Sequence, residues 1–231
     1  MIKAVFLDFF NTLAGYTQSR ERVYTEVCSK YRIPVDVKAL VKAFPVADKY
    51  LRDQFRARPM EKRNKLNLLN LFMNHATILL KSTGIKINKI IAFRLVLNWM
   101  KYKWDFKLFE DALDILKYCK EKGMVTGIIS NIDKDMTDIS EKLGLKPYID
   151  FYVTSQEAGC DKPSPEIFKL ALQKAGIQPE EAIYTGDQYD MDIIGARDVG
   201  IKAILIDRNN WYPEITDCPR IQSLLELKIF L

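Results

Sequence analysis

The sequence has few cysteines and a single histidine, and both shortages exclude kinds of site. Its four cysteines, Cys28, Cys119, Cys160 and Cys218, lie far apart and form no CxxC pair. Zinc sites and disulfide frameworks usually show regular cysteine spacing, so we expect four reduced thiols. The histidine, His75, lies in a helical stretch, and we expect it to be a structural residue.

Long apolar runs are also absent. No segment approaches the roughly 20 apolar residues needed to span a bilayer, and the first residues predict a short strand, so we expect no signal peptide. The 231 residues are 48% hydrophobic and 28% charged, which is typical of a globular core with or without an insertion. We expect a cytoplasmic protein, monomer or homodimer, with no membrane partner.

Charge is divided unevenly along the chain. Residues 15–98 carry 17 Lys and Arg against 6 Asp and Glu, a net charge of +11, whereas the other residues carry 18 and 24, a net charge of −6. Such a basic segment either attracts anions or is a solvated helical face. The sequence contains no RNA- or DNA-binding motif, so we expect a small anionic substrate rather than a nucleic acid.

Apolar periodicity divides the chain into two kinds of structure. Residues 17–98 show apolar residues at spacings of three and four, which predicts four or five helices separated at Pro34, Pro45, Pro59 and Gly84. After about residue 111, apolar strands alternate with amphipathic helices. This alternation predicts an α/β fold, a doubly wound parallel sheet. We assign 1–14 and 99–231 to this core and 15–98 to an inserted all-α cap expected over the carboxyl edge of the sheet.

Polar residues follow several of the predicted strands. Asp8, Ser130, Asp187 and Asp207 each come directly after an apolar run. The carboxyl ends of parallel strands meet at one edge, where ligands bind in open α/β sheets. A carboxylate there can be a nucleophile or a metal ligand. Asp8 and Asp187 would repel each other without a cation, so the pair predicts a divalent ion, and oxygen ligands suit Mg²⁺.

Four segments in order resemble the motifs of the haloacid dehalogenase-like (HAD) superfamily of hydrolases. They are DFFNTL at 8–13, Ser130 after its strand, DKPSPEIF at 161–168, and GDQYDMD at 186–192. Each motif alone is weak, but four in this order, each at a predicted strand end or helix start, form a specific pattern. A helical cap inserted after the first motif is also similar to this family. The resemblance implies a Rossmann-like core, Mg²⁺ and hydrolase activity.

The resemblance also implies roles for individual residues. Asp8 would attack phosphorus and form an aspartyl-phosphate, while Lys162 would neutralise the negative charge that builds up. Thr12 and Ser130 would offer hydroxyls to the phosphoryl oxygens. Substrate contacts are expected from Asn11, Asn131 and Arg20. Asn11 stands where the family usually has glycine, and asparagine is the residue that next best tolerates a positive φ.

The metal ligands implied by the resemblance are Asp8, the backbone carbonyl of Phe10, Asp187 and Asp192. Phe10 itself departs from the family. Most phosphatases of this family have a second aspartate two residues after the nucleophile, which protonates the leaving oxygen and activates water. General acid–base catalysis contributes about 10²- to 10⁴-fold. We therefore expect a preference for aryl or acyl phosphates, whose leaving groups need little protonation.

Two alternatives to the phosphatase remain. The 2-haloacid dehalogenases of the family also have an aromatic residue in place of the second aspartate, and their Asp8 equivalent attacks carbon. They use no Mg²⁺, typically lack the Gly-Asp pair, and need a cap arginine, for which Arg20, Arg22, Arg52 and Arg56 are the candidates. The other alternative is a nearly inactive phosphate-binding protein. Asp187 favours the metal-dependent phosphatase.

Overall fold

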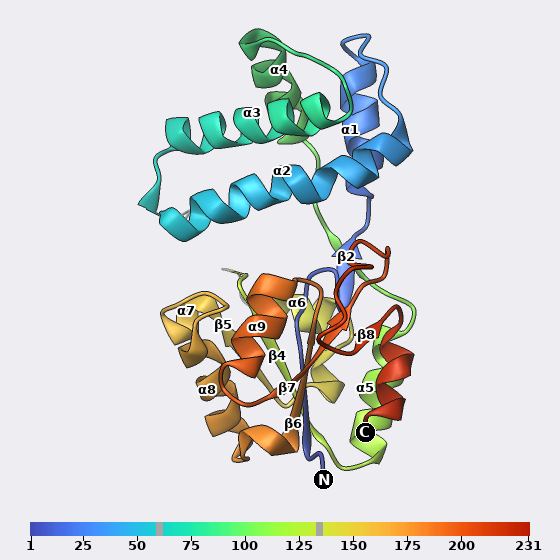
Figure 1. The fold of residues 1–231 in the computed structure, drawn as a ribbon, viewed down its shortest axis with the longest axis vertical. Helices are drawn as coiled ribbons and strands as arrows, with labels where there is room; N and C mark the ends of the chain where they lie inside the picture. Colours follow the sequence, from blue (N-terminus) through green and yellow to red (C-terminus); the bar gives the residue numbers. More distant parts are fainter. Residues whose placement is uncertain (59–61, 133–135) are drawn as a thin grey trace. The chain divides into compact units, whose positions relative to one another are not determined.

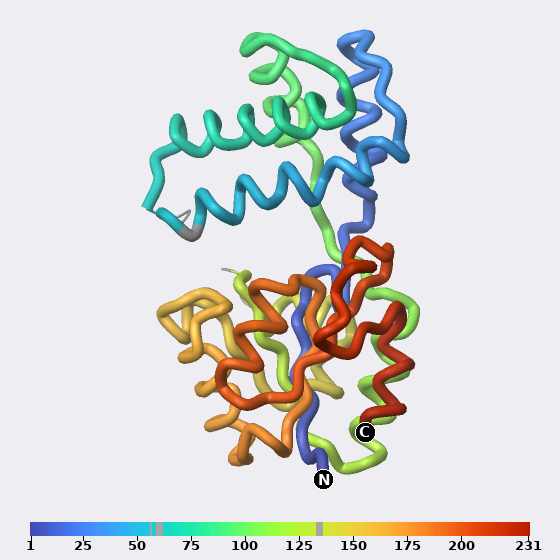
Figure 2. Tube along the Cα trace, in the orientation of Figure 1, coloured from blue at the N-terminus to red at the C-terminus, as the bar shows by residue number. Residues whose placement is uncertain are grey.

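A computed structural model describes residues 1–58, 62–132 and 136–231, and it divides the chain into two compact units (Figure 1). The larger unit comprises Met1–Gly15 and Phe106–Leu231, and the smaller one comprises Tyr16–Asp105. The smaller unit extends beyond residue 98 because Trp99, Tyr102 and Trp104 pack in its apolar cluster. The chain trace in Figure 2 enters this helical unit once and leaves it once.

The larger unit is built on a six-stranded sheet in which every neighbouring pair is parallel, with strand order β5-β4-β1-β6-β7-β8. This confirms the predicted α/β fold. The two-residue strand β8 is too short to give a periodic signal and was not predicted. The strands are β1 (Ala4–Leu7), β4 (Val125–Ser130), β5 (Phe151–Thr154), β6 (Ala182–Gly186), β7 (Lys202–Ile206) and β8 (Arg220–Ile221).

Helices cover both faces of this sheet. Val5 and Leu7 of β1 face one apolar cluster, and Ala4 and Phe6 face the other, as the alternation of side chains along a strand requires. The first cluster includes α5 (Ala112–Glu121), α6 (Met136–Lys142) and the 3₁₀ helix η5 (Leu224–Ile229). The second includes α8 (Pro165–Ala175), the π-helical turn η4 (Tyr189–Ile193) and α9 (Ile194–Arg197).

Short elements complete the larger unit. A separate two-stranded sheet pairs β2 (Ala14–Tyr16) with β3 (Phe106–Leu108). The helix α7 (Ser155–Ala158) follows β5, and the 3₁₀ turns η2 (Lys146–Tyr148) and η3 (Pro179–Glu181) precede β5 and β6. The order of the strands reverses between β1 and β6, because the chain first adds β4 and β5 on one side of β1 and then β6 to β8 on the other. Ligands of open α/β sheets bind at such a reversal.

The described part of the smaller unit contains four helices, α1 (Arg20–Ser29), α2 (Val37–Ala57), α3 (Lys65–Ser82) and α4 (Lys89–Trp99). Each begins after a residue whose side chain accepts a hydrogen bond from a free N–H of the first turn. These capping residues are Ser19, Asp36, Asn64 and Asn88. None of the described helices combines the length and the apolar content that a membrane crossing requires.

The prediction that Pro45 separates two helices is wrong, because Pro45 lies inside α2. Proline removes one helical hydrogen bond, but α2 buries Leu40, Phe44 and Ala47 against the other helices, and this packing keeps the helix continuous. Gly84 does follow the end of α3, with a φ of 86°. Pro59 and the side chain of Arg56 lie outside the described part of the chain.

Candidate active site

The carboxyl edge of the sheet brings three acidic side chains together where the strand order reverses. Asp8 follows β1 and Asp187 follows β6, and these strands are paired with Leu7 opposite Thr185. Oxygens of Asp8, Asp187 and Asp192 all lie within 4.8 Å of one another. Residues distant in the sequence therefore form one acidic site, with Asp8 only 5% exposed and Asp192 fully buried.

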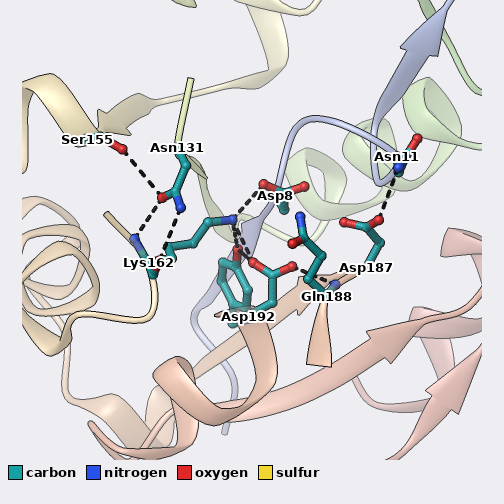
Figure 3. Close-up of polar contacts among 9 residues, drawn as sticks. Asp8, Asn11, Asn131, Ser155, Lys162, Asp187, Gln188 and Asp192 are labelled. Carbon is teal, nitrogen blue, oxygen red and sulfur yellow. Dashed lines mark hydrogen bonds and ion pairs between the residues drawn. The ribbon is translucent and has the colours of Figure 1, made fainter. Parts of the chain in front are cut away.

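Lys162 supplies the positive charge at this site (Figure 3). Its Nζ donates to Asp8 Oδ1 at 2.6 Å and to Asp192 Oδ1 at 2.6 Å, and its side chain is almost completely buried. Burial disfavours the ammonium form, but the carboxylates of Asp192 and Asp8 outweigh this and raise the pKa of Lys162 above its ordinary value. Lys162 is therefore a fixed cation that touches the expected nucleophile.

The main chain of Lys162 is held by the side chain of Asn131. Asn131 Oδ1 accepts from the Lys162 N–H at 2.7 Å, and Asn131 Nδ2 donates to the Lys162 carbonyl at 3.1 Å. Ser155 Oγ also donates to Asn131 Oδ1, at 3.4 Å. The sequence predicts a substrate contact for Asn131, and in the structure both ends of its amide hold the main chain of Lys162.

Tyr184 belongs to the same network and was not predicted. Its hydroxyl donates to Asp192 Oδ1 at 2.7 Å and accepts from Lys162 Nζ at 2.9 Å. Burial, followed by the charges of Asp192 and Asp8, raises the pKa of Tyr184 well above its ordinary value, so the hydroxyl stays a donor. The sequence places Tyr184 in the strand before Gly186. The alternation of side chains along a strand predicts which face of the sheet Tyr184 lies on, but it does not predict which residues its hydroxyl contacts.

Two local features allow Asp192 to reach Lys162. The π-helical turn η4 contains Asp192, whose Oδ2 accepts from the Gln188 N–H at 2.9 Å; such turns are frequent at functional sites. Gly186 is the second feature, because a Cβ at this position would lie 2.3 Å from Asp192 Cγ. The Gly-Asp pair of the fourth motif is thus explained by close approach: any side chain at position 186 would displace Asp192.

Asn11 connects the loop after β1 to Asp187. Its φ is 61°, which confirms that asparagine adopts the left-handed conformation here. Asn11 Nδ2 donates to Asp187 Oδ2 at 3.2 Å, whereas Asp187 Oδ1 is buried with no hydrogen-bond partner among the described residues. Buried polar atoms normally have a partner. An unpartnered carboxylate oxygen beside two other carboxylates fits a site for a hard cation.

The charges of the site also fit the binding of a hard cation. Burial, the negative charge of Asp8 and that of Asp192 raise the pKa of Asp187 well above its ordinary value. Burial also raises the pKa of Asp8 to about 6, with the Asp192 charge adding to the effect and Lys162 opposing it. One lysine therefore does not balance the three clustered carboxylates, and a divalent cation with oxygen ligands would restore the balance.

Three further residues expected at the site, Thr12, Ser130 and Phe10, belong to the larger unit. Thr12 is fully buried, and its Oγ1 has no hydrogen-bond partner among the described residues. Ser130 ends β4 and is 3% exposed. The Phe10 ring packs edge-on against Phe106, with 6.2 Å between the ring centroids. Phe10 thus places an apolar side chain, which exchanges no proton, in the loop after Asp8.

Arg20 lies in the smaller unit and is held there by an ion pair. Its guanidinium donates two hydrogen bonds of 2.7 Å to Asp48, and it lies 4.2 Å from the centroid of the Phe44 ring. His75 is buried in the same network, with Nε2 2.9 Å from Asp48 Oδ1 and Nδ1 3.3 Å from the Tyr24 hydroxyl. We predicted a substrate contact for Arg20; the structure shows a cation already paired within the helices.

This network gives a prediction about stability. Burial works against the charge of Asp48, but Arg20 and His75 hold the pKa of its carboxyl well below the ordinary value. Its stabilising effect is therefore complete above about pH 4 and is lost as the pH falls through the depressed pKa. We expect Asp48→Asn to lower the free energy of unfolding by roughly 2–4 kcal/mol at pH 7, measured by urea denaturation.

The exposed Asp53, on the same helix, provides the matched control. Asp53→Asn should change the free energy of unfolding by less than about 0.5 kcal/mol, and the deficit of Asp48→Asn should shrink between pH 4 and pH 2. An equal deficit at both pH values would contradict an ionic role for Asp48.

Comparison with known proteins gives the family of the chain. A family model for haloacid dehalogenase-like hydrolases matches residues 2–200, and the chain therefore belongs to this family of enzymes. It is 39% identical over 101 residues to the haloacid dehalogenase-like hydrolase domain-containing protein 3 of Mus musculus, a match that covers 44% of this chain and 40% of the mouse protein. The chain spans about half or less of the length of the first curated relatives it matches.

Two further similarities extend over most of the chain. The glyceraldehyde 3-phosphate phosphatase of Methanothermobacter thermautotrophicus is 27% identical over 225 residues, which is 95% of this chain and 90% of the relative. The crystal structure of a magnesium-bound HAD hydrolase from Bacillus subtilis matches with a TM-score of 0.66 and 17% identity, and the match covers 100% of this chain and 98% of that one. The structural likeness concerns the fold alone.

Proposed function

We propose that the protein is a Mg²⁺-dependent phosphatase that acts through an aspartyl-phosphate on Asp8. The observation that carries the proposal is the fixed ammonium of Lys162 on one oxygen of Asp8, beside an acidic cluster that one lysine does not neutralise. The phosphatase relatives support the choice of phosphorus rather than carbon as the point of attack. The substrates are small phosphorylated molecules with good leaving groups.

The residues of the site have different roles in the proposed reaction. Lys162 occupies Asp8 Oδ1, so Oδ2 is the oxygen that attacks phosphorus and forms the new P–O bond. The bond to the leaving oxygen breaks, and its electron pair departs with that oxygen. Lys162 then stabilises the negative charge shared by Asp8 and the transferred group. In the second step water attacks the same phosphorus, the bond between phosphorus and Asp8 Oδ2 breaks, and the electron pair returns to the Asp8 carboxylate while the protons of the water leave with the phosphate.

The residues that would hold Mg²⁺ are Asp8, Asp187, Asp192 and the carbonyl of Phe10. When bound, the ion stabilises negative charge on the phosphoryl oxygens as a Lewis acid. Asp187 offers its unpartnered Oδ1 for this role. Asp192 already bonds Lys162, Tyr184 and the Gln188 N–H, so it serves chiefly to hold Lys162.

The metal is tested by its removal. We expect hydrolysis of p-nitrophenyl phosphate with Mg²⁺ present, its loss in EDTA, and recovery when Mg²⁺ is added back. Mg²⁺ should also raise the Tm of the wild type but not that of Asp187→Asn, because ligands that bind the folded state stabilise it. Full activity in EDTA would contradict the proposal.

Phe10 favours a second candidate, a 2-haloacid dehalogenase, because halide leaves carbon without a proton. In that enzyme Asp8 would attack carbon and release chloride from 2-chloropropionate in EDTA. Chloride release without metal, together with no phosphate release from p-nitrophenyl phosphate, would identify this activity. Phosphate binding with neither reaction would instead indicate a phosphate-binding protein.

Charge and cysteine chemistry support the other parts of the proposal. The net charge of +11 over residues 15–98 attracts anions from solution, which fits a small phosphorylated substrate. All four cysteines are free, two of them buried, and free thiols persist in a reducing compartment. We therefore include a cytoplasmic location in the proposal.

A further inference from the structure

A hollow of about 90 Å³ lies beside Asp187, on the side of the site formed by β7. Its lining includes Asn11, Asp187 and three aromatic residues, Phe109, Trp211 and Tyr212. All of these residues belong to the larger unit. The volume exceeds the roughly 10–15 Å³ that a single water requires, so it has room for the edge of a planar ring next to the acidic cluster.

The loop that carries Trp211 is fixed by Asp207, the strand-end residue that received no role from the sequence. Asp207 Oδ1 accepts from the Trp211 N–H at 2.7 Å, and Oδ2 accepts from the Tyr212 N–H at 2.9 Å and from Arg220 Nη1 at 2.9 Å. Asp207 is 2% exposed. The loop is thus tied to β7 and β8, and a pocket whose wall is already ordered loses little entropy when a ligand binds.

The opposite wall is fixed in the same way. The guanidinium of Arg208 lies 4.1 Å from the centroid of the Phe109 ring and donates to both oxygens of Asp111, at 2.9 and 2.8 Å. Arg208 Nη2 also donates to the Thr12 carbonyl at 2.8 Å. These bonds connect the wall to the loop of the nucleophile, so the hollow keeps its position relative to Asp8.

We infer that this hollow binds the aromatic ring of the leaving group, so that the core itself selects aryl phosphates, with Trp211 as the main determinant. The inference rests on the proposed function and names its substrate class. Two separate features favour it. Phe10 supplies no proton, so the leaving group must depart as a stable anion, as a phenolate does. Aromatic walls bind a ring through its large apolar faces and edges.

The reaction then balances without an acid at position 10. Asp8 Oδ2 forms the bond to phosphorus, the P–O bond to the aryl group breaks, and its electron pair remains on the phenolate oxygen. The phenolate leaves the hollow and takes its proton from water in the bulk. Hydrolysis of the aspartyl-phosphate consumes one water and gives phosphate.

The test compares two substrates whose leaving groups need no protonation but differ in having a ring. These are p-nitrophenyl phosphate and acetyl phosphate. We expect Trp211→Ala to lower the ratio of their kcat/KM values about tenfold, and Trp211→Phe to restore most of that ratio. Tyr118→Ala, which removes an aromatic ring from α5 of the same unit, should leave the ratio unchanged. An unchanged ratio in Trp211→Ala overturns the inference.

A failure of the proposed function gives a different result. If the wild type hydrolyses neither substrate, the phosphatase activity is excluded. A binding measurement then tests whether the hollow accepts an aromatic ring. Calorimetry with phenylphosphonate and methylphosphonate should show a preference for the aromatic compound that Trp211→Ala reduces about tenfold. Equal affinity for the two phosphonates in the wild type would overturn the aromatic pocket.

Discussion

Asp8→Asn should reduce phosphate release from p-nitrophenyl phosphate at least roughly 10⁴-fold, as loss of a nucleophile does in other hydrolases. An amide does not form the aspartyl-phosphate, and it also removes one of the two carboxylates that bond Lys162 Nζ. The measurement is the rate of p-nitrophenolate release with saturating Mg²⁺, together with circular dichroism to show that the variant is folded.

Asp190→Asn is the matched control for this variant. Asp190 is an exposed acid in the same π-helical turn as Asp192, and it takes part in none of the hydrogen bonds of the site described above. Its substitution should leave the rate within about twofold of the wild type. Activity in a folded Asp8→Asn variant comparable with that of Asp190→Asn would show that another residue is the nucleophile.

Phe10→Asp should raise the turnover of alkyl phosphates by up to about 10²- to 10⁴-fold. The new carboxyl would protonate the leaving oxygen and then take a proton from the attacking water. Aryl phosphates should gain much less, because a phenolate departs without protonation. The measurement is phosphate release from an alkyl and an aryl monoester, compared in the wild type and in the variant.

Phe10→Asn separates proton transfer from the change in packing. Both variants lose the contact of the Phe10 ring with Phe106, and the two new side chains have nearly the same size. Only the aspartate exchanges a proton. A gain shared by both variants would mean that removing the ring, rather than adding an acid, changes the rate. No gain in either would mean that another group already supplies the proton.

Much of the fold follows from local patterns in the sequence. The apolar strands and the helices between them predict a parallel sheet because the crossover rule leaves few other arrangements. That rule also brings Asp8 and Asp187 to the same edge. The positive φ of Asn11 was predictable because few other residues tolerate it.

The hydrogen-bond and ion-pair partners of side chains are much harder to predict from the sequence than the positions of the strands and helices. Asn131 follows its strand as a substrate-binding residue would, yet its amide bonds the main chain of Lys162. Arg20 is one of many basic residues, and only the folded helices show that Asp48 neutralises it. Such contacts join residues that are far apart in the chain. They depend on how the elements pack, which the spacing of apolar residues in the sequence does not predict.

The contact between Asp8 and Lys162 joins residues separated by 154 positions, and the entire helical unit lies between them in the chain. During synthesis the carboxylate of Asp8 therefore precedes its counter-ion, Lys162, by more than half of the chain. The ion pair needs both residues, so a chain that ends before Lys162 lacks it, although it already contains the whole helical unit and β4.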